Sequence, residues 1–161
     1  MHTEHPIPPL YDGDSKILIL GSFPSVKSRE AMFFYGHPQN RFWKVIASVL
    51  NSDIPRTVDE KKELLLKNNI ALWDVIASCD IIGSSDSSIK NAIANDIEPI
   101  LKKSQIKQVF TNGKTAQSLY DKYIFPRCKI AAVPLPSTSP ANAAWNFEKL
   151  LSEWRILKEH L

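Results

Sequence analysis

Residues 16–25 read Lys16-Ile17-Leu18-Ile19-Leu20-Gly21-Ser22-Phe23-Pro24-Ser25, and this stretch decides how the rest of the chain is interpreted. The continuous apolar run predicts a strand over 16–20 that is covered on both faces, as in a parallel sheet. The glycine and proline that follow end the strand and open a long loop over 21–39. Loops of this length inside a compact domain are usually functional, so a site is expected where this strand ends.

Strands and helices alternate along the rest of the chain. Further apolar runs predict strands over 70–73, 107–111 and 129–134. Apolar residues at three- and four-residue steps predict helices between and after them, over 40–50, 57–66, 95–103, 114–123 and 141–160. A polar, serine-rich stretch over 79–91 is expected to be a second long loop. The alternation predicts an α/β fold, a three-layer α/β/α sandwich around a central, mainly parallel four-stranded sheet.

Length and composition predict a single domain over 1–161, with the polar, proline-rich residues 1–15 as a surface arm. The chain has 161 residues, of which 43% are hydrophobic, enough for a full core. It has no apolar stretch as long as a membrane span and no apolar signal region near Met1, so a cytoplasmic protein without membrane association is expected. The lack of a heptad pattern favours a monomer.

Cysteine and histidine usage predicts no metal site. Cys79 and Cys128 lie far apart, and the four histidines have no metal-ligand spacing. The net charge of +3 permits nucleic-acid binding without demanding it. Affinity for a nucleic acid would have to come from a local basic patch and from backbone amides at helix starts.

Polar residues gather where the predicted strands end. Gly21, Asp74, Asn112 and the segment 136–142 each follow one of the four strands. Ligands of such folds bind at the carboxyl ends of the strands, so these residues are expected to meet in one site. Asn40 is expected to cap the helix that starts there, because its side-chain oxygen can accept a free backbone amide proton.

Two segments resemble the signature motifs of the hypoxanthine-DNA glycosylase family, within the uracil-DNA glycosylase superfamily. Motif one is matched by Gly21-Ser22-Phe23-Pro24, Ser28, Tyr35, His37-Pro38, Asn40 and Phe42-Trp43, and motif two by Pro136-Ser137-Thr138-Ser139-Pro140-Ala141-Asn142. Weaker matches lie between them, at 71–75, at Gly83-Ser84 with Asp86, and at Asn112-Gly113. The resemblance thus covers nearly the whole chain in the correct order.

This resemblance implies a DNA glycosylase that acts in base-excision repair. Such an enzyme flips a deaminated base, hypoxanthine before uracil, out of the stack and hydrolyses its N-glycosidic bond to leave an abasic site. Flipping costs a few kcal/mol and costs least in a mismatched pair. The implied partner is DNA containing deaminated bases, and no cofactor is required. The motifs place no lysine to form a Schiff base with the sugar, so a monofunctional enzyme without strand cleavage is expected.

The resemblance also implies roles for residues around the base. Asn40 falls where the family has its catalytic asparagine, and its amide would orient the attacking water. Tyr35 would stack on the extruded base, worth roughly 1–3 kcal/mol. Asp74, where uracil-specific relatives have an asparagine, would accept a ring N–H of the base. The predicted base pocket is completed by Gly21, Ser22, Phe23, Pro24 and Ser78.

Motif two is expected to hold the DNA backbone. Ser137, Thr138 and Ser139 precede a helix predicted to start at Ala141, and hydroxyls and free helix-start amides bind phosphates well. Asn142 would either reach into the duplex or cap this helix. Further expected DNA contacts are Ser25 and Ser28, with Lys27, Arg29 and Arg41 as basic candidates.

Two departures from the uracil enzymes leave alternatives open. Phe23 stands where those enzymes carry an acidic residue that activates water, and Leu135 stands where they carry a histidine facing the base. The departures favour hypoxanthine. They leave open a uracil or mismatch-specific uracil glycosylase, and a non-catalytic damaged-DNA-binding module on the same fold.

Two unrelated functions receive little support from the sequence. A phosphate-binding P-loop over 108–115 would need a glycine where Gln108 stands, although Gly113-Lys114-Thr115 fits its second half. A serine hydrolase would need a Gly-x-Ser-x-Gly turn, which the chain does not contain.

Overall fold

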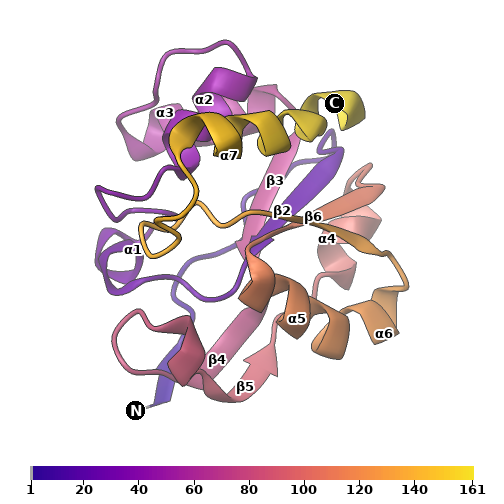
Figure 1. Cartoon of the computed structure of the whole chain (residues 1–161). Helices are drawn as coiled ribbons and strands as arrows, with labels where there is room; N and C mark the ends of the chain where they lie inside the picture. Colours follow the sequence, from indigo (N-terminus) through magenta and orange to yellow (C-terminus); the bar gives the residue numbers. More distant parts are fainter. Residues whose placement is uncertain (1) are drawn as a thin grey trace.

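The computed structural model describes residues 2–161 and has three layers, with helices on both faces of a central sheet (Figure 1). The sheet has the strand order β3 (Ile70–Asp74), β2 (Ile17–Gly21), β6 (Gln108–Asn112) and β7 (Ala132–Leu135), and all neighbours are parallel. The predicted α/β/α sandwich with a four-stranded parallel sheet is therefore confirmed. The four strands point the same way, so their carboxyl ends share one edge.

Two groups of helices cover the two faces of the sheet (Figure 1). The first group contains α2 (Phe42–Val49), α3 (Val58–Lys67) and α7 (Phe147–Trp154). The second contains α4 (Glu98–Lys103), α5 (Lys114–Tyr123) and α6 (Phe125–Cys128). Successive residues of a strand point to opposite faces, so Ile17 and Ile19 enter the first core while Leu18 and Leu20 enter the second.

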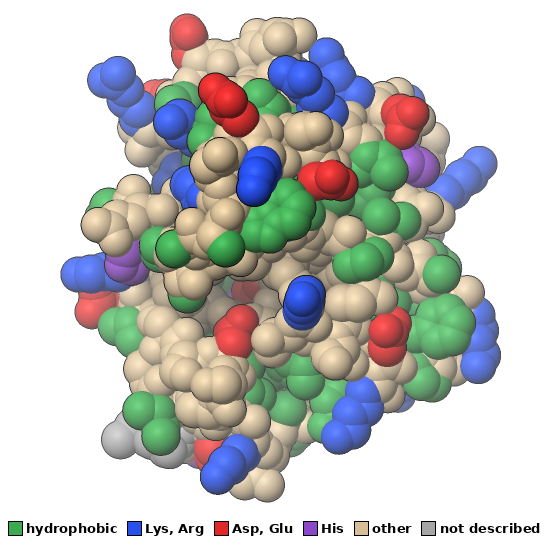
Figure 2. All heavy atoms as spheres, in the orientation of Figure 1, with side chains coloured by type: hydrophobic (Ala, Val, Ile, Leu, Met, Phe, Trp, Pro, Cys, Tyr) green, Lys and Arg blue, Asp and Glu red, His purple; other side chains and the backbone are tan. Residues whose placement is uncertain are grey.

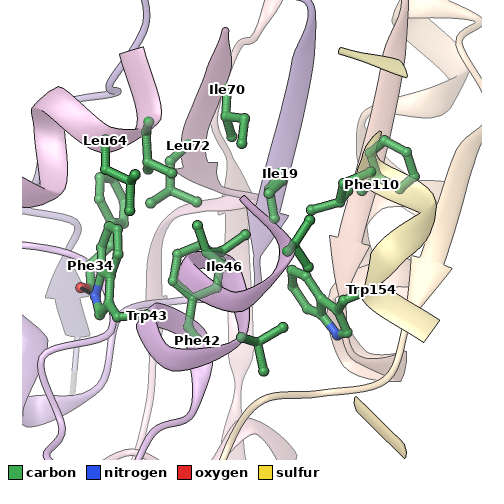
Figure 3. Packing of buried hydrophobic residues seen from close by; sticks show 14 of the residues in the cluster. Ile19, Phe34, Phe42, Trp43, Ile46, Leu64, Ile70, Leu72, Phe110 and Trp154 are labelled. Carbon is green, nitrogen blue, oxygen red and sulfur yellow. Dashed lines mark hydrogen bonds between the residues drawn. The ribbon is translucent and has the colours of Figure 1, made fainter. Parts of the chain in front are cut away.

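The first core is the more aromatic of the two (Figure 3). Phe42 meets Trp154 edge to face with ring centroids 5.8 Å apart. The indole nitrogen of Trp154 donates a hydrogen bond to the carbonyl of Pro136 at 2.9 Å. Trp154 thus joins α7 both to α2 and to the loop that leaves β7.

A second, smaller sheet was not expected from the sequence. It is antiparallel and contains β1 (His2–Glu4), β4 (Ile76–Asp80) and β5 (Lys90–Ala94). The prediction of a long loop over 79–91 is wrong, because this stretch holds the end of β4, a short 3₁₀ turn η1 (Asp86–Ser88) and the start of β5. The pairing partner of β4 comes from the other end of the sequence, which local patterns cannot reveal.

The N-terminal segment is also more deeply packed than a surface arm would be. β1 pairs with β4, and Leu10 forms an antiparallel bridge with Leu72. Ile7 and Leu10 are 3% and 9% exposed. The expectation of a surface arm over 1–15 is therefore wrong around Ile7 and Leu10, which belong to the core.

The boundaries of two helices differ from expectation. The helix predicted over 141–160 is instead α7 followed by a 3₁₀ segment η2 (Arg155–His160). It begins after Asn146, whose side chain caps it by accepting a hydrogen bond from the Lys149 amide. In addition, the long loop over 21–39 contains a short helix α1 (Val26–Ala31) capped by Ser25.

We expect Trp154→Ala to cost about 3–5 kcal/mol of unfolding free energy, because it leaves a large cavity in a fully buried position and an unpaired carbonyl on Pro136. Urea denaturation followed by circular dichroism measures this loss. Ile54→Ala, at a residue that is 51% exposed, serves as the control and should change stability by less than about 0.5 kcal/mol. Equal effects of the two substitutions would contradict the packing described above.

Candidate functional site

A cavity of about 620 Å³ lies at the carboxyl ends of three strands. Gly21, Asp74 and Asn112 are the last residues of β2, β3 and β6, and all three line it. Figure 2 shows a hollow in this face, between the part that carries α7 and the part that carries β4 and β5. The predicted site residues in its wall are Gly21, Ser22, Phe23, Pro24, Ser25, Ser28, Tyr35, Asn40, Asp74, Ser137, Thr138 and Ser139. Ser78 and Asn142 do not line it.

The side chain of Asn40 is held in one orientation by two donors. Its Oδ1 accepts hydrogen bonds from the Phe42 amide and from the Thr138 hydroxyl, each at 2.9 Å. The prediction that Asn40 is the N-cap of this helix is wrong, because α2 begins at Phe42 and Arg41 holds the N-cap position; Asn40 instead binds the first amide of α2 from one residue further out. Because both lone pairs of this oxygen are used, only the amide N–H groups of Asn40 remain to act on a ligand in the cavity.

Thr138 connects Asn40 to the end of β6. Its hydroxyl accepts from Asn112 Nδ2 at 3.0 Å, and its backbone amide donates to Asn112 Oδ1 at 3.0 Å. Thr138 is fully buried. Its predicted role as a phosphate ligand is therefore wrong, since its hydroxyl is already engaged inside the protein.

Arg41 shapes the motif-two segment from inside. Its guanidinium donates to the carbonyls of Ser139 and Asn142, each at 3.1 Å, and to that of Trp145. These three bonds hold 139–145 in turns, which explains why no helix starts at Ala141. Arg41 is thus committed to the protein backbone and is not a free phosphate ligand.

The serines of motif two keep hydroxyl protons available. Ser137 Oγ accepts from the Ser139 amide, and Ser139 Oγ accepts from the Ala141 amide, each at 3.1 Å. Both hydroxyl groups remain able to donate to a ligand. Asn142, by contrast, donates to the Ser137 carbonyl at 3.0 Å, so its side chain stiffens the segment and does not cap a helix.

Ser25 and Ser28 organise the loop that carries motif one. Ser25 Oγ accepts from the Ser28 amide and donates to Ser28 Oγ. Ser28 Oγ also accepts from the Gly36 amide at 3.0 Å, and Ser28 is 2% exposed. The expected contact of Ser28 with DNA is therefore wrong, because this residue fixes the loop from within.

Asp74 and Tyr35 meet above Gly21. A Cβ atom on Gly21 would lie 2.4 Å from Asp74 Oδ1 and 3.0 Å from the Tyr35 hydroxyl. Only glycine leaves room for both groups at this point, which explains why β2 ends in Gly21. The structure thus brings the two predicted base-binding side chains within reach of one ligand.

Tyr35 holds a buried hydroxyl without a hydrogen-bond partner among residues 2–161. Burial and the nearby charge of Asp74 raise the pKa of Tyr35, with Asn112 offsetting part of the effect, so the hydroxyl stays neutral at physiological pH. Its ring stacks on Phe42, with centroids 4.1 Å apart at 18°. One ring face is therefore already covered, and the residue adopts a left-handed backbone with φ of 53°, a conformation that is often retained at functional positions.

Asp86 adds a second carboxylate to the cavity. It lies on η1, and its Oδ1 accepts a hydrogen bond from Ser22 Oγ at 2.8 Å. Close packing of the cavity wall raises the pKa of Asp86; the bond from Ser22 lowers it in part, and the charge of Asp74 raises it further. The residue is nevertheless exposed to solvent through the open cavity, so the free-energy consequence is small.

Sequence reasoning missed the role of His5. Its Nε2 lies 2.8 Å from Asp74 Oδ2, and the two side chains are 3% and 6% exposed. His5 lies in the stretch expected to be a surface arm, 69 residues from its partner, and no local signal connects them. Asp86 was noticed only as part of a weak motif match, and its position in the cavity depends on the unexpected second sheet.

Residues 2–161 contain neither a cluster of metal-ligating side chains nor a membrane-spanning helix. Within that range, no group of three His, Cys, Asp or Glu side chains is placed to hold a metal ion. No helix of the same range is long and apolar enough to cross a membrane.

We expect Asp86→Asn to stabilise the protein more at pH 7 than at about pH 3. The pKa of Asp86 is higher in the folded than in the unfolded state, so the native protein loses stability as the pH rises through that range, whereas the variant does not. The asparagine oxygen still accepts from Ser22. The gain at pH 7 should stay below about 1 kcal/mol, because cavity water screens the charges. Urea unfolding at both pH values measures this, with Asp53→Asn as an exposed control. A stability difference between variant and native protein that does not grow with pH would contradict the expectation.

Comparisons with known proteins agree on one family. A sequence model described as the Uracil DNA glycosylase superfamily matches residues 8–158. A protein named hypoxanthine DNA glycosylase from Methanosarcina acetivorans is 32% identical over 155 residues, which cover 95% of this chain and 96% of the relative. A protein of the same name from Methanosarcina barkeri is 37% identical over 110 residues, covering 66% of this chain and 69% of the relative.

A solved structure supports the same grouping. It is a solution NMR structure of a Methanosarcina acetivorans protein described as a candidate uracil DNA glycosylase. The two structures agree with a TM-score of 0.80 at 28% sequence identity, over 98% of this chain and 99% of the other. The strand order, the motif-bearing cavity and these similarities lead to one conclusion: the chain belongs to the uracil-DNA glycosylase superfamily.

Proposed function

We propose that this protein is a monofunctional DNA glycosylase that removes hypoxanthine, the product of adenine deamination, from DNA. It flips the damaged nucleotide into the cavity and hydrolyses the bond between C1′ of the sugar and N9 of the base, leaving an abasic site. The observation that carries the proposal is the fixed carboxamide of Asn40 in the wall of a cavity of about 620 Å³, which is large enough to admit a flipped nucleotide. The names of the similar proteins support the choice of base.

The chemistry at Asn40 is positioning and charge stabilisation. As the C1′–N9 bond breaks, its electron pair leaves with the base, and the sugar becomes oxocarbenium-like. Water then adds to C1′ and releases a proton to solvent. Because Oδ1 of Asn40 is fully used, Asn40 cannot take that proton; its N–H groups donate to the oxygen of the water and hold it in place. Such a fixed dipole needs no reorganisation during the reaction.

The wall of the cavity suits a base that carries N–H donors. The free oxygens of Asp74 and Asp86 accept hydrogen bonds, and Tyr35 contributes a neutral, unpartnered hydroxyl. Hypoxanthine presents a ring N–H beside a carbonyl oxygen, which matches an acceptor beside a hydroxyl donor. Adenine lacks that ring N–H and would leave an acceptor unpaired, which is costly in a buried site.

Contacts with the DNA backbone come from fewer residues than the motifs suggested. Ser137 and Ser139 line the cavity and keep hydroxyl protons free for phosphate oxygens. The chain around them is held by Arg41 and Asn142, so little ordering is needed when DNA binds. We further propose that the enzyme acts as a monomer and without a cofactor.

Uracil is the second candidate base, because it too carries a ring N–H beside carbonyl oxygens and Asp74 accepts from either. Phe23 is 7% exposed and occupies the position of the acidic water-activating residue of uracil enzymes, which supports slower chemistry on uracil. A non-catalytic damage sensor remains the alternative to an enzyme, and the experiment below separates them.

The proposal is tested with labelled duplexes that contain one deoxyinosine, deoxyuridine, deoxyxanthosine or undamaged deoxyadenosine. We expect alkali-dependent cleavage at deoxyinosine, and a rate about 10²–10³-fold lower for Asn40→Ala because one preorganised hydrogen-bond donor is lost. Asn146→Ala is the control: it likewise removes an asparagine whose side-chain oxygen binds a backbone amide at the start of a helix, but it does not line the cavity, so it should cost about 1 kcal/mol of stability and leave the rate unchanged. Binding without cleavage of any duplex would favour the sensor.

A second prediction concerns the space above Gly21. We expect Gly21→Ala to lower the excision rate by about 10²-fold while the protein stays folded, because the new methyl group displaces the Asp74 carboxylate and the Tyr35 hydroxyl. Gly13→Ala is the control, since a Cβ atom at Gly13 would lie 3.7 Å from the Lys103 carbonyl oxygen, an ordinary van der Waals contact. Single-turnover rates on deoxyinosine duplexes decide this. An unchanged rate for Gly21→Ala would show that neither group touches the substrate.

A further inference from the structure

His5 makes a directed hydrogen bond that no motif accounts for. The backbone amide of Ile7 donates to His5 Nδ1 at 3.1 Å, so Nδ1 is an acceptor and the ring proton of a neutral imidazole lies on Nε2. That Nε2–H faces Asp74 Oδ2 at 2.8 Å. The tautomer is thus set by the backbone two residues away, and the imidazole acts as a donor toward the carboxylate.

His5 is enclosed by aromatic rings and does not line the cavity. Phe23, Phe34 and Trp73 lie around it at centroid distances of 5.8, 6.3 and 6.2 Å. With a side chain only 3% exposed, it cannot contact DNA or an extruded base. Any effect of His5 on substrate therefore acts through Asp74, the one polar side chain within residues 2–161 to which it is bonded.

The segment that carries His5 is itself firmly attached. The Trp73 indole donates to the Ile7 carbonyl at 3.1 Å, and the His5 amide donates to the Ala77 carbonyl at 2.8 Å. Trp73 precedes Asp74 in β3, and Ala77 lies in β4, which follows two residues later, so the imidazole is fixed relative to the carboxylate it faces. His5 lies before residues 8–158, which match the superfamily model.

We propose that His5 is a positioning residue for base recognition. By binding Oδ2 it fixes the Asp74 carboxylate so that Oδ1, above Gly21 and beside the Tyr35 hydroxyl, accepts the ring N–H of the extruded base. The inference rests on the proposed function. A hydrogen bond to a charged group is worth enough to change a rate about 10- to 100-fold, which sets the size of the expected effect.

The test compares two substitutions that differ in one hydrogen-bond donor. His5→Phe keeps a flat ring in the aromatic surroundings and removes the donor, whereas His5→Gln carries an amide N–H that can reach the position of Nε2. We expect His5→Phe to lower the single-turnover rate on deoxyinosine about 10- to 100-fold and His5→Gln to stay within about threefold of the native enzyme. His2→Gln, at a side chain that is 55% exposed, is the matched control and should leave the rate unchanged.

Three further measurements separate positioning from folding. In an Asp74→Asn background, His5→Phe should cause no additional loss of excision rate, because the carboxylate through which His5 acts on the base is already absent. The affinity for DNA that contains an abasic-site analogue should stay within about twofold in all variants, because such DNA presents no base to Asp74. Long-range ¹H–¹⁵N spectra of the native enzyme should show the proton of His5 on Nε2, whether or not the variants fold.

Several results would overturn the inference. They are equal losses for His5→Phe and His5→Gln, an unchanged rate for His5→Phe, the same loss in the Asp74→Asn background, or a proton on Nδ1. A native enzyme that cleaves no base in any duplex would overturn the proposed function and this inference with it. Active native enzyme with an insensitive His5 would overturn the inference alone.

Discussion

The hydroxyl group of Thr138 is the contact on which the site depends. It accepts from Asn112 and donates to Asn40, and so it connects the end of β6, the motif-two segment and the start of α2. Asn40 and Thr138 are 98 residues apart, and Asn112 and Thr138 are 26 apart. Being fully buried, this hydroxyl has no water to replace a lost partner, so all three segments must be in place together.

The charge of the cavity wall is opposite in sign to the net charge of the protein. The chain carries a net charge of +3, which favours approach to DNA, yet the inner wall holds Asp74 and Asp86. Phosphates are therefore attracted to the molecule but repelled from the cavity floor. In the proposed function, DNA backbone contacts would then be left to the rim, while the carboxylates would accept the N–H groups of a neutral base inside the cavity.

Much of the fold and part of the site could be predicted from the sequence. Apolar runs located the four strands of the central sheet, and strand ends located Gly21, Asp74 and Asn112. What the sequence could not show were partners distant along the chain: β1 beside β4, His5 beside Asp74, and Arg41 inside the motif-two segment. Thr138 and Ser28 were assigned to DNA because hydroxyls in loops suit phosphates, but a sequence does not reveal which hydroxyls are turned inward.

The contacts of Arg41 with 139–145 bear on how the protein acquires its activity during folding. Arg41 reaches the Trp145 carbonyl across 104 residues, a separation close to that between Asn40 and Thr138. Closing loops of this length has a large entropic cost, so contacts of this kind form late, after the local helices and neighbouring strands. A partly folded chain would contain the sheet and the helices but no assembled site for a base. On this argument the site is gained only when the segments that hold Asn40 and Arg41 meet the motif-two segment, late in folding.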